Sequence, residues 1–234
     1  MQLLTLAQLR AIEEQALIRD EDLVALAGSA SASWLANNFD KKSRILVVVG
    51  RGNNGADGIS CAIELIKLGY KVDLVRLFKD STEVNQKWLS QFTESKRALI
   101  RLPADMSKYN VIVDAIYGIG LTHEIDVETA GIVQKLNNHN GFMVSLDSPS
   151  GLNPFSGRVL GDAIYADATL TFISDKPGLH TGDGLDFSGD IHVIDLVKLT
   201  DYSVPSSMNV IKFNQMSDVN YDDLVRTRFN TNKG

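Results

Sequence analysis

Residues 45–58, ILVVVGRGNNGADG, indicate the fold more clearly than any other stretch of the chain. The five apolar, mostly β-branched residues at 45–49 predict a buried strand. A glycine-rich turn follows, and the helical spacing of apolar residues after it predicts a helix that opens at Asp57 and closes at Gly69. A strand, a glycine turn and a helix start form a ready anion site, because free backbone N–H groups and the helix dipole point at the turn.

The same turn satisfies the G-x-G-x-x-G pattern of dinucleotide-binding proteins, although that match alone is weak. The turn also holds two adjacent amides, Asn53 and Asn54, and the carboxylate of Asp57. A carboxylate would repel a pyrophosphate. We therefore expect the turn to hold something besides a phosphate.

Composition and charge are those of an ordinary globular protein. The 234 residues suffice for one large α/β domain, and a net charge of −6 argues against a nucleic-acid partner. The single cysteine, Cys61, excludes an internal disulfide and fits a reducing compartment. We see no signal peptide, no zinc-ligand spacing of histidines, and no apolar run near the ~20 residues that span a bilayer. These features predict a soluble, cytoplasmic protein that binds neither nucleic acid nor membrane.

Strands and helices are expected to alternate along the chain. The expected strands are 45–49, 71–77, 97–102, 111–116, 142–146, 169–172 and 191–194. The expected helices are one after a Thr5–Gln8 capping box, one at 22–37 loosened by Gly28, the one that opens at Asp57, one capped by Ser81, and one at 127–138. This alternation predicts an α/β fold, a Rossmann-like three-layer sandwich around a mostly parallel, doubly wound sheet. We expect the domain to occupy residues 1–200 and the more polar residues 201–234 to be a C-terminal extension or linker.

Three polar, glycine-rich segments fall at the ends of predicted strands. They are GRGNNGADG at 50–58, DAIYGIGLTHE at 114–124 and DSPSGLNPFSG at 147–157. A single segment of this kind is most simply turn chemistry, because Gly, Asn, Asp and Pro meet the backbone needs of turns. In an open α/β sheet, however, ligands bind outside the carboxyl ends of the strands. Three such segments at one edge therefore favour a binding site.

Oxygen atoms from Asn54, Asp114 and Ser150 come from the three different loops. Oxygen ligands without Cys or His suit a hard cation, and a single carboxylate favours a monovalent ion over Mg²⁺ or Ca²⁺. The simpler alternative is that Asp114 only accepts backbone N–H bonds at a strand end. Composition alone favours that alternative.

Two charged residues are further candidates for chemistry. Asp147 precedes the tight turn that contains Pro149, and a carboxylate beside such a turn in a cleft is a candidate base. Capping of its own turn is an equally good interpretation. Lys176 follows a predicted strand and could face the same cleft, although such a lysine is more often a solvated loop residue. Cys61 is expected to be packed in the core.

At these segments the chain resembles the NAD(P)H-hydrate epimerase family, which also forms the N-terminal domain of the bifunctional NAD(P)H-hydrate repair enzyme. The family's N-N-G-G-D-G pattern appears as NNGADG at 53–58, and its D-A-hydrophobic-aromatic-G-x-G-L pattern appears as DAIYGIGL at 114–121. Its D-I-P-S-G-L pattern appears as DSPSGL at 147–152, and ADATLTFISDKPGL at 166–179 matches a later feature. The opening helix, which starts with Thr5, also looks similar. The resemblance covers about residues 3–196.

The resemblance implies an isomerase that interconverts the R and S forms of NADHX and NADPHX, nicotinamide cofactors hydrated at C6 of the reduced ring. It implies a potassium ion at Asn54, Asp114 and Ser150, in agreement with the hard-cation hypothesis. It also makes Asp147 a substrate ligand and our candidate catalytic residue. The other implied substrate contacts come from two loops and are Asn53, Asn54, Gly55, Ala56, Asp57, Gly118, Ile119, Gly120, Leu121, Thr122, His123 and Glu124. Two residues depart from the family pattern, Ala56 in place of glycine and Ser148 in place of an apolar residue, and neither change removes a polar group.

The last residues, RTRFNTNKG at 226–234, resemble the stretch that leads into the dehydratase domain of the fused enzyme. We therefore expect an epimerase domain cut from a bifunctional protein, or a natural one that lacks its fusion partner. The candidate partners are a fused or separate ADP/ATP-dependent hydrate dehydratase and, in a homodimer, a second copy of this chain.

Two other functions remain open from the sequence. An NAD(P)-dependent oxidoreductase would use the glycines of the first turn and Asp73 as a ribose ligand, but Asp73 is not clearly at the end of its strand. A non-catalytic nucleotide-binding protein would share the fold, because fold does not fix function. The intact set of Asn54, Asp114, Asp147 and Ser150 argues against a non-catalytic protein.

Overall fold

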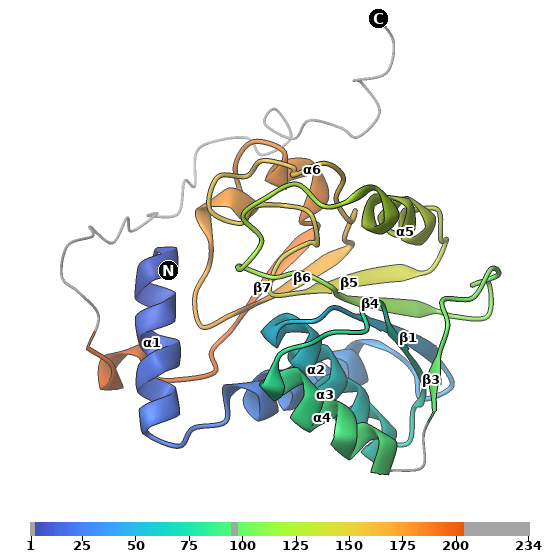
Figure 1. The fold of residues 1–234 in the computed structure, drawn as a ribbon, viewed down its shortest axis with the longest axis horizontal. Helices are drawn as coiled ribbons and strands as arrows, with labels where there is room; N and C mark the ends of the chain where they lie inside the picture. Colours follow the sequence, from blue (N-terminus) through green and yellow to red (C-terminus); the bar gives the residue numbers. More distant parts are fainter. Residues whose placement is uncertain (1–2, 95–97, 204–234) are drawn as a thin grey trace, which may run out of the picture.

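The computed structural model describes residues 3–94 and 98–203 and contains one seven-stranded sheet in the order β3-β2-β1-β4-β5-β6-β7 (Figure 1). The strands are β1 (Arg44–Val49), β2 (Lys71–Arg76), β3 (Leu99–Ile100), β4 (Val111–Ala115), β5 (Phe142–Leu146), β6 (Ala168–Phe172) and β7 (Asp190–Ile194). The helices are α1 (Leu6–Ile18), α2 (Leu23–Asn38), α3 (Asn53–Lys67), α4 (Glu83–Glu94), α5 (Val127–Asn137) and α6 (Gly184–Phe187), with short 3₁₀ turns at Pro177–Leu179 and Leu199–Asp201.

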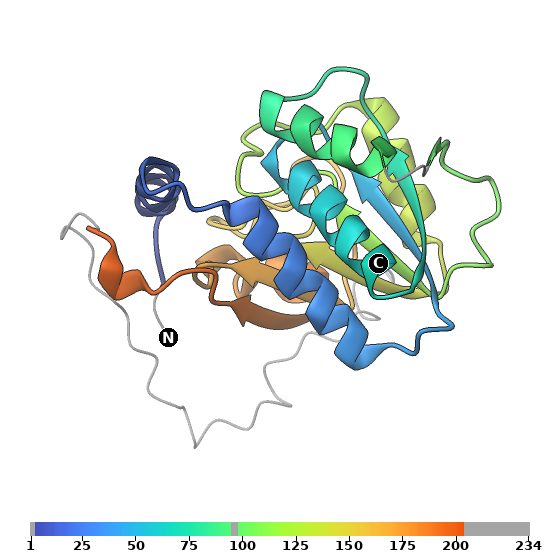
Figure 2. The same cartoon turned by 90° about the horizontal axis from the view of Figure 1, so that it is seen from below.

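Every pair of neighbouring strands in this sheet is parallel. Helices α2, α3 and α4 cover one face of the sheet, and α5 covers the other (Figures 1 and 2). The prediction of a three-layer, doubly wound α/β fold is therefore confirmed. The order of the strands reverses between β1 and β4, and in open sheets of this kind ligands bind at such a switch point.

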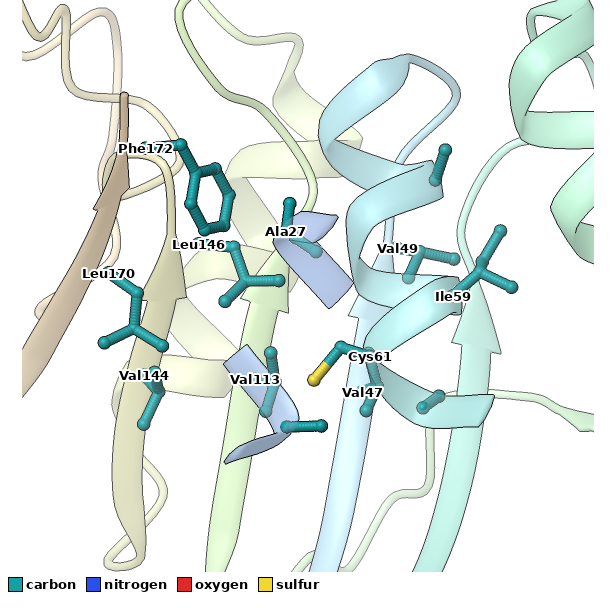
Figure 3. Close-up of a cluster of buried hydrophobic side chains, with 14 of the residues drawn as sticks. Ala27, Val47, Val49, Ile59, Cys61, Val113, Val144, Leu146, Leu170 and Phe172 are labelled. Atoms are coloured by element: carbon teal, nitrogen blue, oxygen red, sulfur yellow. The ribbon is translucent and has the colours of Figure 1, made fainter. Parts of the chain in front are cut away.

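Alternate side chains of the central strands pack into two separate hydrophobic cores, one on each face of the sheet. Val47 and Val49 of β1 point to the α2–α3 side, where they pack with Ile59 and Cys61 of α3 (Figure 3). Leu46, the residue between Ile45 and Val47, packs on the other side with α5. Because both faces are buried, the strand has a continuous apolar sequence without alternation. The expected packing of Cys61 is confirmed, and burial raises the pKa of its thiol.

Most expected elements are present, and the capping box of Thr5 and Gln8 opens α1 as predicted. Two predicted starts are wrong. Helix α3 begins at Asn53 rather than Asp57, behind Gly52, which caps it without a side-chain bond. At α4, the Asn85 N–H donates to Thr82 Oγ1, so Thr82 caps the helix in place of Ser81.

Two further differences concern an edge strand and a glycine. The strand expected at 97–102 is only Leu99–Ile100, which pairs with β2 alone at the sheet edge. Gly28 does not loosen α2. A Cβ there would lie 2.1 Å from Ser60 Oγ of α3, so Gly28 permits the close approach of the two helices.

Candidate active site

A pocket of about 1070 Å³ lies over the carboxyl ends of the central strands, at the switch point. Its floor comes from the segments that follow β1, β4 and β5, and its walls include residues of α1 and α4. Its size matches the larger small-molecule sites of proteins, which are roughly 300–1,000 Å³. The three glycine-rich segments of the sequence therefore meet at one edge, as predicted.

Asn54 lies in the first turn of α3 and lines this pocket. The nitrogen and oxygen of its side-chain amide are both buried and have no hydrogen-bond partner among the described residues. Buried polar atoms are nearly always paired in folded proteins. An amide left in this state is therefore suited to a bound ion or ligand.

Asp114, at the end of β4, is fully buried beneath the pocket. Its Oδ2 accepts from Ser145 Oγ (2.8 Å) and the Ser150 N–H (2.9 Å), and its Oδ1 accepts from Ser150 Oγ (2.5 Å) and the Ile116 N–H (3.2 Å). Burial raises the pKa of Asp114, and these four donors oppose that rise. Asp114 and Ser150, from different loops, are thus in direct contact.

The Gly118 region connects this buried pair to Asn54. The Tyr117 N–H donates to Ser150 Oγ (2.8 Å), and a Cβ on the next residue, Gly118, would lie 3.2 Å from the Asn54 Cβ. The three predicted metal ligands therefore flank one short segment. All three carry oxygen atoms of the kind that a hard cation binds, and the cation itself stays a prediction.

Asp147 lines the pocket with a left-handed backbone, φ +66°. Its Oδ2 accepts from the Ile119 N–H (3.0 Å), and its Oδ1 lies 2.9 Å from Lys176 Nζ. Lys176 is 1% exposed, so the solvated-loop interpretation of this lysine is wrong. No side-chain bond of Asp147 to its own turn occurs among the described residues. Its carboxylate instead contacts Ile119 and Lys176, which both line the pocket.

Asp57 of α3 and Glu13 of α1 are among the other carboxylates that line this pocket. Neither has a hydrogen-bond or ion-pair partner within the described part of the chain. Burial raises the pKa of Asp57 well above its usual range, and the carboxylates of Asp147 and Glu13 raise it further. Burial, and then Asp147, also raises the pKa of Glu13.

Comparison with known proteins agrees with this arrangement. Residues 20–178 match the family described as YjeF-related protein N-terminus. The chain belongs to this family. It is 36% identical to the NAD(P)H-hydrate epimerase of Weissella koreensis over 163 residues, 69% of this chain and 73% of that protein.

Other relatives of this YjeF-related chain include a two-domain protein. The bifunctional NAD(P)H-hydrate repair enzyme Nnr of Dictyoglomus turgidum is 28% identical over 94% of this chain and 45% of its own length. The crystal structure of the yeast protein ynu0 shares the fold, with a TM-score of 0.68 and 22% identity, over 78% of this chain and 85% of that one.

The structure of this YjeF-related chain places the predicted substrate contacts unevenly. Those on the pocket wall are Asn53, Asn54, Asp57, Gly118, Ile119, Gly120, Leu121, His123, Glu124 and Asp147. Gly55, Ala56 and Thr122 lie off the wall. The Ala56 side chain is buried in the core, so the methyl group that departs from the family pattern packs against protein.

Sequence reasoning missed the wall that α1 supplies, which includes the Glu13 carboxylate. The signal was present, because Glu13 directly follows the spaced apolar residues Leu9 and Ile12 after Thr5.

Asp73, the ribose ligand that an oxidoreductase would need, does not line the pocket. It lies within β2 opposite Leu46, and its Oδ2 accepts from Tyr109 Oη (2.8 Å).

No helix in the described ranges is both long enough and apolar enough to cross a bilayer.

Proposed function

We propose that this chain is an NAD(P)H-hydrate epimerase, an isomerase that interconverts the R and S forms of NADHX and NADPHX in nicotinamide cofactor repair. The observation that carries the proposal is that Asn54 and Asp147 line the switch-point pocket, while the buried Asp114–Ser150 pair contacts Tyr117 of the pocket wall. Membership of the YjeF-related family and the names of the curated relatives support it.

The reaction inverts a carbon that carries a hydroxyl group beside the ring nitrogen. Loss of water and its return on the other face would invert this carbon, and so would opening and closing of the ring. Loss of water needs a proton on the hydroxyl oxygen, and the returning water must lose one; ring opening needs removal of the hydroxyl proton and a proton on the ring nitrogen. We propose that Asp57, whose pKa burial raises, donates to the hydroxyl oxygen in the first route or to the ring nitrogen in the second. We propose that Asp147, paired with Lys176, accepts the proton from the returning water or from the hydroxyl group, and the reverse transfers restore both carboxyl groups.

We further propose a potassium ion held by Asn54, Asp114 and Ser150. The unpaired, buried amide of Asn54 and the contact of Asp114 with Ser150 support the proposal. When bound, the ion would supply positive charge next to the pocket and favour ionised carboxylates.

The bounds of the domain and the role of the residues that follow it are also proposals. We propose that residues 1–200 form the epimerase domain and that 201–234 are an extension of the kind that joins it to an ADP/ATP-dependent dehydratase. The match to a bifunctional relative over 94% of this chain supports this view. A cytoplasmic location and a homodimer remain predictions.

The decisive experiment mixes purified protein with R-NADHX and follows the appearance of S-NADHX by NMR or chromatography. We expect faster equilibration than without protein and no net oxidation or reduction. The Asp147→Asn variant should lose on the order of 10²-fold in rate while remaining folded. An unchanged rate with the wild-type chain would refute the proposal, and NADH oxidation would favour the oxidoreductase.

A further inference from the structure

Lys176 is among the largest fully buried side chains of the domain. Its Nζ donates to Thr171 Oγ1 (2.5 Å), to the Phe172 carbonyl (3.2 Å) and to Asp147 Oδ1 (2.9 Å). A fourth acceptor, the Ser174 carbonyl, lies 3.4 Å away, so every donor of the ammonium group can be satisfied, which fits a charged lysine. Asp147 is its only ion-pair partner in the described part of the chain.

Asp147 is held from its other side as well. Its own N–H donates to the Leu170 carbonyl (2.7 Å), and the Ile119 N–H donates to Oδ2 (3.0 Å). Its left-handed backbone costs an aspartate on the order of 1 kcal/mol, so neighbouring contacts must maintain it. Among the described residues, Lys176 supplies the only ion pair to Asp147.

Asp147, Asp57 and Glu13 are three of the carboxylates that line the pocket, and the buried cation Lys176 forms an ion pair only with Asp147 among them. Like charges in one partly dry site cannot all ionise at low cost. The cation therefore decides which carboxylate carries the negative charge. Burial raises the pKa of Asp57 and Glu13, in agreement with this division.

We propose that Lys176 is a positioning residue for the epimerisation, which fixes the carboxylate of Asp147 and concentrates the pocket's negative charge on it. This role rests on the proposed epimerase function. Lys176 is nearly inaccessible and acts through Asp147 rather than on the substrate.

The test compares four proteins, wild type, Lys176→Met, Asp147→Asn and the double variant, for kcat and KM in the R-to-S NADHX assay. If Lys176 acts through Asp147, each single variant should lose on the order of 10²-fold in kcat, with KM changed only a few-fold. The double variant should be no slower than Asp147→Asn alone, because the group that Lys176 positions is already lost. Lys67→Met, which removes an exposed lysine paired with Glu64 on α3, should match wild type.

A Lys176→Met variant with wild-type kcat would overturn the proposal, and so would losses that multiply in the double variant. Should Lys176→Met fail to fold with an unpaired carboxylate inside, the double variant compared with Asp147→Asn decides alone, because it buries no unpaired charge. A wild-type chain without epimerase activity would instead refute the proposed function. The two failures are thus distinguishable.

Discussion

Asp57 shows how the pocket uses an unfavourable side chain. Asp57 is half-buried and has no hydrogen-bond or ion-pair partner among the described residues; such a carboxylate lowers stability, and proteins retain it where chemistry needs it. Its raised folded pKa lies above the unfolded value near 3.8. The folded protein thus keeps a proton that the unfolded chain releases, and stability falls as pH rises from about 4 through the folded pKa.

We expect Asp57→Asn to stabilise the protein more at pH 8 than at pH 5. The Asp57 carboxyl becomes costly to keep in the folded protein as pH rises, whereas Asn is neutral at both pH values. The gain at pH 8 should be on the order of 1 kcal/mol, or ~2–4 °C in Tm. Epimerisation should slow, since Asn supplies no proton. Thermal unfolding at both pH values tests this, with the exposed Asp190→Asn as control. A gain independent of pH would show that Asp57 is ionised in the folded state.

Asp114 allows a direct test of the ion. Potassium that binds only the folded protein should raise Tm in KCl relative to equal NaCl. Asp114→Ala should abolish that difference and also cost about 2–4 kcal/mol of unfolding free energy, because four donors lose their acceptor. Ser145→Ala removes one of those donors but no proposed ion ligand, and should keep the potassium response. Equal Tm values of the wild type in both salts would count against the site.

Helices α2 and α3 meet where Gly28 lies against Ser60. A glycine inside a helix usually weakens it, because glycine gives up more backbone freedom than alanine. At Gly28 that cost allows close packing, since an added Cβ would lie 2.1 Å from Ser60 Oγ and 2.8 Å from the Cys61 nitrogen. Gly131 in α5 is the opposite case, with open space around its ideal Cβ.

Gly28→Ala should therefore destabilise the protein by about 1–3 kcal/mol, as overpacked cores do. Gly131→Ala should stabilise it by about 0.5–1 kcal/mol through helix propensity. Urea unfolding of both variants checks the contrast. A Gly28→Ala variant as stable as wild type would mean that the two helices separate without cost.

The elements that the sequence predicts well are those with a strong local signal. Strand β1 has a continuous apolar run, and α1 has a capping box. The predicted start of α3 is wrong because Asn53 and Asn54 are typical turn residues. They can nevertheless occupy the first turn of a helix, where the backbone N–H groups have no acceptor within the helix. The site loops were predictable from motifs, but the burial of Lys176 was not, since it depends on contacts between distant segments.

Helix α1 packs against the last segment that the structure describes. This helix lies beside the segment at 199–203 (Figures 1 and 2). The Gln15 side chain accepts from the Ser203 N–H (3.0 Å) and donates to its carbonyl (2.9 Å). The Tyr202 hydroxyl donates to Glu21, and the Arg19 guanidinium lies 4.4 Å from the Tyr202 ring centre. Because α1 also supplies a pocket wall, the segment at 201–203 helps to hold that wall.

Tyr202→Ala should accordingly weaken substrate binding. Without the ring and hydroxyl, the end of α1 loses its contacts to the departing chain, and Glu13 and its neighbours are less well placed. A loss of about 1 kcal/mol in binding would raise KM roughly five-fold. The kcat value should change little, because the Asp147–Lys176 pair does not involve α1. Asp147 follows β5, and Lys176 lies in the segment after β6. Steady-state epimerisation kinetics measure both constants. The control is Thr200→Ala in the same segment, because the Thr200 hydroxyl donates only to Asp201 among the residues that the structure describes. If Tyr202→Ala lowered kcat and left KM unchanged, α1 would influence the reacting groups themselves rather than the closure of the pocket around the substrate.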